Sequence, residues 1–69
     1  MLNLTPREFE LLTHLCEGRA GKIAADRMGI TLGTVEKYLD SMHDKFDVRT
    51  TLEMVCIAFR SGLIPIEKP

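Results

Sequence analysis

The sequence predicts an all-α protein, a single domain of four helices over residues 1–69. Four segments carry apolar side chains at three- and four-residue spacing, and residues that commonly begin or end helices separate them. Of the 69 residues, 45% are hydrophobic and 28% are charged, which is typical of a small globular domain and not of a disordered chain. No segment alternates as a β-strand does.

We expect the first helix over residues 6–17. Thr5 can cap its N-terminus, Pro6 suits the first helical position, and Glu8 stands three residues after the cap, as in a capping box. Gly18 is a residue type that commonly follows a helix end. The inner face is then expected to consist of apolar residues at helical spacing, namely Phe9, Leu12, Leu15 and Cys16.

A second helix is expected over residues 21–28, where Ala24, Ala25 and Met28 share a face and Gly29 can end the helix with a positive φ. Thr31 suits the N-cap of a third helix over residues 32–46. The inner stripe of that helix is Val35, Leu39, Met42 and Phe46. Two helices joined by so short a turn are typical of the DNA-binding helix-turn-helix unit.

The fourth helix is expected over residues 51–61, because Thr50 to Glu53 repeats the capping-box pattern and Gly62 follows. Residues 54–59 are all apolar, so a wheel centred on Val55 and Ala58 leaves apolar surface outside the core. A second copy of the chain can cover this strip, with Glu53 near the other copy's Arg60, or another domain of a longer protein can cover it. The strip comprises Leu52, Glu53, Cys56, Ile57, Phe59 and Arg60.

Several functions are not expected from the sequence. Cys16 and Cys56 lack metal-ligand spacing, so we expect no bound metal, no cofactor and no disulfide. His14 and His43 are isolated, and without a nucleophile, base and orienting group together the chain is not expected to be an enzyme. No small-molecule ligand is expected within this segment. The chain has neither an apolar run of about 20 residues nor a signal pattern, which predicts a cytoplasmic protein that does not enter a membrane.

Particular motifs resemble one family. They are L-T-P-R-E at residues 4–8, M-G-I-T at 28–31, T-V at 34–35, K-F at 45–46 and G-L-I at 62–64. In these motifs the chain resembles the LuxR-type (GerE- or NarL-like) helix-turn-helix domain of bacterial transcription regulators. The resemblance implies a third helix that enters the major groove of DNA and a fourth helix that pairs two copies on a two-fold site.

The resemblance is weakest where the family contacts DNA. The family's usual T-V-K-x-H is here Thr34-Val35-Glu36-Lys37-Tyr38, and Asp40 occupies a position that is often basic. With a net charge of −1, any DNA-binding face must be local. Between Thr31 and Val48 the chain has two bases and four acids: Lys37 and Lys45 against Glu36, Asp40, Asp44 and Asp47.

Carried over by position, the resemblance implies phosphate contacts from Lys22, Lys45 and the hydroxyls of Thr31 and Thr34. The residues expected to face bases are Thr34, Glu36, Lys37, Asp40 and Ser41. Two interpretations of Glu36 stay open: the carboxylate accepts from a cytosine amino group, or it is a solvated acid on a surface that does not meet DNA.

Two functions therefore compete. The first is a bacterial transcription regulator, or its effector domain, that binds duplex DNA as a homodimer with modest affinity. The second is a helix-turn-helix scaffold that has become a protein-interaction module. An example is an antagonist that forms a heterodimer with another LuxR-type regulator through the fourth helix. The first is the leading interpretation, and the acidic third helix is the feature that favours the second.

Overall fold

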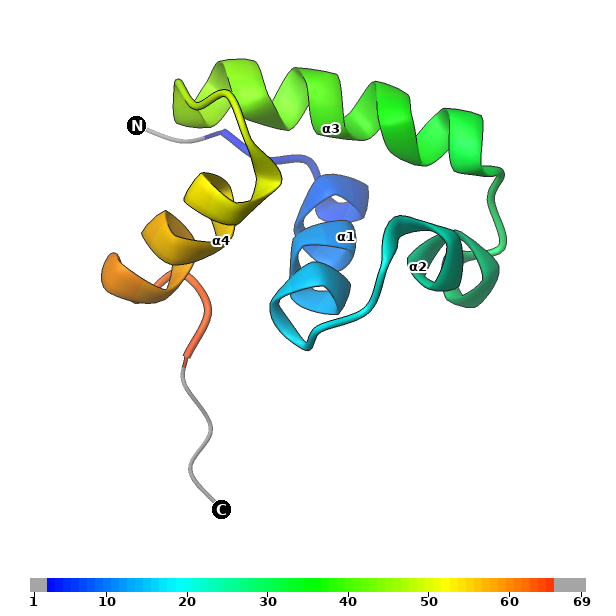
Figure 1. Ribbon diagram of the computed structural model, residues 1–69, viewed down its shortest axis with the longest axis horizontal. Coiled ribbons are helices and arrows are strands. Elements are labelled where there is room, and N and C mark those ends of the chain that lie inside the picture. The colour runs from blue at the N-terminus through cyan, green and yellow to red at the C-terminus, as the bar shows by residue number, and fades with distance from the viewer. Residues whose placement is uncertain (1–2, 66–69) are drawn as a thin grey trace.

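The computed structural model describes residues 3–65, which form four helices: α1 (Pro6–Cys16), α2 (Gly21–Met28), α3 (Leu32–Phe46) and α4 (Thr51–Arg60). The all-α fold class is confirmed, and residues 3–65 contain no strand. The longest helix, α3, lies across one side of the molecule, with the other three helices beneath it (Figure 1). Residues 1–2 and 66–69, which belong to the irregular ends expected from the sequence, lie outside the described part.

Threonine caps begin three of the helices. The hydroxyl of Thr5 accepts from the amide of Glu8 at 3.1 Å, that of Thr31 from Thr34 at 3.2 Å, and that of Thr50 from residue 53 at 3.1 Å. In α1 the box is complete, because the carboxylate of Glu8 also accepts from the backbone amide of Thr5 at 2.9 Å. Each such cap is worth about 1 kcal/mol, which suits helices too short to be stable alone.

The turn between α2 and α3 is three residues long. It depends on Gly29, whose φ of 70° is left-handed and favours glycine. The amide of Ile30 then donates to the carbonyl of Ala25 at 3.0 Å, which closes the end of α2. Because the chain reverses so tightly, Thr31 is already in position to cap α3.

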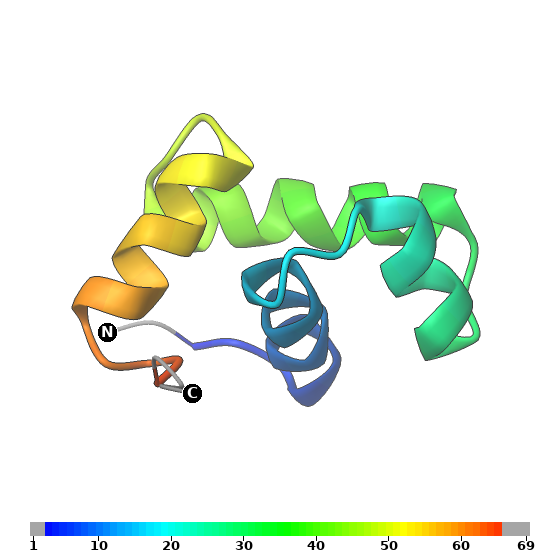
Figure 2. The same ribbon diagram turned by 60° about the horizontal axis from the view of Figure 1, so that its bottom comes forward.

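The core lies between α3 and the three helices beneath it. Within residues 3–65, α1 and α3 each contact every other helix, whereas α2 and α4 do not contact one another. Figure 2 shows α1 between them, with α4 on one side and α2 on the other. The buried apolar side chains are Leu11, Leu12, Ala24, Ala25, Met28, Val35, Met42, Phe46, Met54, Ala58 and Ile64.

The structure corrects the expected face of α1. Phe9, expected in the inner stripe, is 41% exposed, whereas Leu11 and Glu8 are buried. Apolar residues lie on more than one side of this helix, so their spacing does not determine which side is inner. The burial of Glu8 selects the observed side, because its carboxylate finds a partner there. The helix also ends at Cys16, one residue earlier than expected.

The expected face of α4 is corrected in the same way. Its buried residues are Met54 and Ala58, not Val55, which is only half-buried. Ile57, expected on the outer strip, is half-buried and packs against the core. With six consecutive apolar residues, the pattern of α4 defines no single inner side. The helix ends at Arg60, one residue earlier than expected.

Candidate nucleic-acid interface

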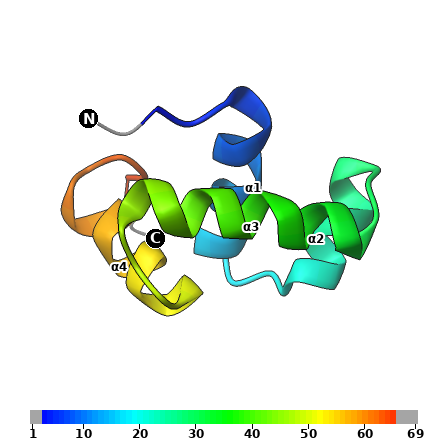
Figure 3. The ribbon, with the colours of Figure 1, turned by 90° about the horizontal axis from the view of Figure 1, so that it is seen from above.

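One whole side of α3 faces solvent. Viewed from above in Figure 3, α3 crosses in front of the other helices. Val35, Met42 and Phe46 are buried on its underside and fix its rotation about its own axis. The outer face, defined by its exposed residues, comprises Leu32, Gly33, Glu36, Lys37, Asp40 and Asp44. An α-helix supported from beneath with a free side has the shape that a major groove admits.

The outer face of α3 is acidic. Lys37 is its one base, against the exposed carboxylates of Glu36, Asp40 and Asp44. Asp47, which ends the helix in the left-handed region at φ 56°, adds a further exposed acid at the same end. Successive acids lie about 5 to 6 Å apart along the helix axis, which is within a Debye length, so a partner that approaches the face meets a continuous negative field. Phosphates are repelled and cations are attracted.

The N-terminal end of α3 is more favourable to DNA. The hydroxyls of Thr31 and Thr34 lie 3.0 Å apart, and each can make a further hydrogen bond. A Cβ built on Gly21 would lie 3.6 Å from Leu32, so the first residue of α2 packs on the first residue of α3. Lys22 is the next residue of α2 and is exposed.

Lys45 and Ser41 are not on the outer face. The ammonium of Lys45 donates to Glu8 Oε1 at 2.6 Å and to the carbonyl of Asn3 at 2.9 Å. Its side chain is 29% exposed, and that of Glu8 only 4%. Ser41 is half-buried. Lys45, expected at DNA, therefore binds within the fold, and any phosphate contact by Lys45 competes with Glu8.

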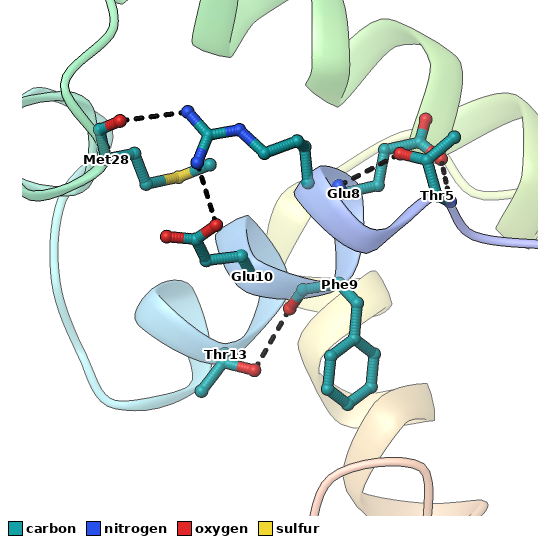
Figure 4. Close-up of polar contacts among 7 residues, drawn as sticks. Thr5, Glu8, Phe9, Glu10, Thr13 and Met28 are labelled. Carbon is teal, nitrogen blue, oxygen red and sulfur yellow. Dashed lines mark hydrogen bonds and ion pairs between the residues drawn. The ribbon is translucent and has the colours of Figure 1, made fainter.

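The carboxyl group of Glu8 keeps its charge despite its burial. Burial by itself raises its pKa, but hydrogen bonds from Lys45, the Thr5 amide and Ser41 together hold the pKa below the ordinary value of 4.5. Figure 4 shows the paired contacts of Glu8 and Thr5. Glu8 is therefore ionised at neutral pH, and its negative charge offsets the positive charge of Lys45.

Arg7, the neighbour of Glu8, connects α1 to α2. Its Nη2 donates to the carbonyl of Met28 at 2.9 Å, and its Nη1 to Glu10 Oε1 at 2.9 Å (Figure 4). The sequence alone did not indicate these roles of Arg7 and Glu8. The motif that contains them, L-T-P-R-E, indicates only a helix start and a family resemblance. Helix-start statistics say nothing about contacts to residues far along the chain.

The outer strip of α4 is partly as expected. Leu52 is 74% exposed, and Glu53, Cys56 and Arg60 are exposed beside it. Phe59 is half-buried and lines a hollow of about 670 Å³ with Phe9, Thr13, Cys16, Glu17, Ile64 and Pro65. Ile57 and Phe59 both pack against the core, so the exposed apolar part of the strip is Leu52 and Cys56, with the acid Glu53 and the base Arg60 on the same helix.

The cysteines and histidines have ordinary surroundings. Burial, together with the charge of Glu17, raises the pKa of the Cys16 thiol, which makes it less nucleophilic. His14 accepts from Arg19 at 3.1 Å, and His43 lies 3.2 Å from the hydroxyl of Thr51.

Among residues 3–65, no three His, Cys, Asp or Glu side chains gather as they would around a metal ion. No helix in the same range has the length and apolar character to cross a membrane.

Comparison with known proteins agrees with this geometry. Residues 2–58 match a family model described as bacterial regulatory proteins, luxR family. The chain is 33% identical to the transcriptional regulatory protein MctR of Rhizobium johnstonii, over 88% of this chain and 28% of that protein. It is 33% identical to the transcriptional activator protein ExaE of Pseudomonas putida (91% and 29%) and 31% identical to LiaR of Bacillus subtilis (90% and 29%). The chain thus spans under a third of each of these relatives.

Replacing Lys45 by Met should destabilise the protein by about 1–3 kcal/mol at pH 7, because the buried carboxylate of Glu8 then lacks its charged partner. The upper part of that range is reduced by the partial exposure of Lys45. Chemical denaturation measures the change. Lys37→Met, an identical substitution on the exposed side of α3, should change stability by less than about 0.5 kcal/mol. Equal losses in the two variants would contradict a structural role for the Lys45 pair.

The free energy of unfolding should decrease at acid pH because Glu8 becomes protonated. Because the pKa of Glu8 is lower in the folded protein than its ordinary 4.5, the unfolded chain binds the proton first as the pH drops. The contribution of Glu8 is therefore complete above about pH 5 and is lost as the pH falls through the folded pKa. Denaturation curves from pH 7 to pH 3 should show a shallower decline for Glu8→Gln than for the wild type. Parallel curves would contradict this assignment.

Proposed function

Because the chain belongs to the LuxR family of bacterial regulatory proteins, we propose that it is a transcription regulator, or the effector domain of one, that binds duplex DNA through α3 as a dimer. The observation that carries the proposal is the free side of α3. Buried residues hold the helix from beneath, and the short turn after α2 precedes it, within the segment that the family model matches. This arrangement suits insertion into a major groove.

Contacts to the DNA backbone come from the N-terminal end of α3. Lys22 and the hydroxyls of Thr31 and Thr34 contact phosphates there and set the register of the helix. Lys45 contributes little, because Glu8 and Asn3 already bind its ammonium. On the outer face, Glu36 accepts from a cytosine amino group and Lys37 donates to a guanine. Asp40 lies further along the exposed face, where it excludes bases that present only acceptors.

The dimer forms through α4. On this helix Leu52 and Cys56 are exposed one turn apart, with Glu53 and Arg60 at the two ends of the strip. An isologous, antiparallel pairing brings each Glu53 to the other copy's Arg60 and covers the apolar centre. The charge pattern along α4 is thus complementary to itself.

A second candidate function follows from the acidity of α3. Its outer face has one base against three acids, Asp47 adds a fourth acid, and Lys45 is bound inside the fold. Such a surface repels phosphates and suits a protein partner. In this alternative the chain pairs through α4 with another LuxR-type regulator. In the mixed dimer, the acidic α3 of this chain is repelled by the DNA phosphates, which weakens DNA binding by the dimer. The chain then acts as an antagonist of its partner.

A genome-wide selection with the purified protein at low and high salt tests the main proposal. It should yield a two-fold motif, with binding that weakens as salt rises. Lys22 supplies one phosphate-contacting cation per copy, so the slope of log K against log [salt] should be about −1 for one copy and about −2 for a dimer. Absence of any enriched motif and of salt-dependent retention at low ionic strength would refute DNA binding.

Glu36→Lys separates the two functions. If the chain reads DNA, the variant should change the preferred base at one position per half-site and steepen the salt slope by about one per copy. If the chain is an interaction module, the variant should gain salt-dependent retention without any motif. Asp26→Lys makes the same charge change on exposed α2 and is the control. A motif shift in the control as large as that of Glu36→Lys would remove the assignment of Glu36 to base contact.

Leu52→Glu tests the α4 dimer. Because Leu52 is 74% exposed, the substitution leaves the core intact and replaces a largely exposed apolar side chain of the pairing strip with a carboxylate. Sedimentation at micromolar concentration should give a dimer for the wild type and a monomer for the variant. Ile23→Glu, on the exposed part of α2, should stay dimeric. A wild-type monomer, or an unchanged dimer in Leu52→Glu, would exclude this interface.

A further inference from the structure

Arg7 holds the end of α2, directly before the turn that leads to α3. Its guanidinium donates to the carbonyl of Met28 at 2.9 Å, and Met28 is the last residue of α2. The last carbonyls of a helix have no partner within the helix and lie at its negative end. A cation that donates to one of them therefore satisfies a free acceptor and is favoured by the helix dipole.

The same turn of α1 also holds the far end of α3. Glu8 binds Lys45, and Lys45 is the penultimate residue of that helix. Two consecutive side chains of α1 thus attach to the residue before the turn and to the opposite end of a helix about 22 Å long. The residue before the turn and the far end of α3 are thus both bound to α1. These two attachments restrict the tilt of α3 relative to α2 more than burial of one face of α3 does alone.

We propose that Arg7 is a positioning residue for α3, and that it sets the angle at which the outer face of α3 meets its partner. This inference rests on the proposed function, because positioning matters for recognition only if α3 is the contact surface. Arg7 itself touches no partner. It acts through the carbonyl of Met28, the turn at Gly29, and the start of α3.

The chemistry of the contact requires a guanidinium. Nη2 of Arg7 donates to Met28 while Nη1 donates to Glu10, so the two bonds leave from separate nitrogens of one rigid plane. Glu10 thereby orients the group toward α2. A lysine has a single nitrogen on a flexible stem and cannot reproduce both directions. The Arg7 side chain is 44% exposed, so its replacement removes these bonds without opening the core.

The test compares Arg7→Met with Glu10→Gln in hydrogen exchange measured by NMR. Met keeps the apolar stem of Arg7 and loses the bond to Met28, whereas Gln at position 10 leaves that bond in place. The reporters are the amides of Gly29 and Ile30, which bond to carbonyls in the last turn of α2. In Arg7→Met they should exchange about tenfold faster than in the wild type, with little change in the slowest amides of α3. Glu10→Gln should change them by less than about twofold.

DNA binding supplies the second readout, with the motif selected by the wild type and an unrelated duplex. In Arg7→Met the ratio of specific to non-specific affinity should fall by about tenfold, while the salt slope stays unchanged because no phosphate contact is lost. Arg7→Lys should not restore the ratio.

Three results would overturn the positioning role. A salt slope reduced by about one would make Arg7 a phosphate contact. Equal acceleration of the turn amides and of the slowest α3 amides would make it a general stabiliser of the fold. Wild-type exchange rates at Gly29 and Ile30 in Arg7→Met would show that the bond to Met28 fixes nothing. If the wild type binds no DNA, the proposed function fails, and the exchange comparison alone decides whether Arg7 fixes the turn.

Discussion

The buried carboxylate of Glu8 is the constraint on which the arrangement of the helices depends. It closes the capping box that begins α1, and it binds the lysine near the end of α3. A carboxylate 4% exposed is costly without such partners, so the inner side of α1 and the position of the end of α3 are determined together. The same bond affects the charge of the surface, because it pairs one of the two lysines of α3 with a carboxylate.

The fold of this molecule therefore favours DNA binding, whereas the charge of α3 opposes it. The free side of α3, the short turn and the family match support a DNA-binding helix, while the exposed carboxylates oppose the approach of phosphates. Base contacts tolerate acids when the acceptor matches a cytosine amino group, but backbone contacts do not. The balance consequently depends on the few accessible donors near the start of α3, namely the hydroxyls of its threonine cap and the exposed Lys22 at the start of α2.

Local signals explain which parts of this fold could be predicted from sequence. Thr5, Thr31 and Thr50 act on residues three positions away, so their patterns indicated where three helices begin, and Gly29 indicated the turn. The inner sides of α1 and α4 were less accessible, because both helices are apolar over a wide arc and tertiary contacts select the buried side. The inward position of Lys45 depends on a residue 37 positions away, which no helical period or cap encodes.

The absence of contact between α2 and α4 within residues 3–65 has a consequence for how such a domain can diverge. The start of α2, beside α3, and the outer strip of α4 make no direct contact, so substitutions in the two regions are expected to add in free energy except where both act through α1 or α3. Selection can then alter the target of a regulator without altering its choice of dimer partner, and the reverse. A family built on this plan can generate many combinations of target and partner from small, separate sets of mutations.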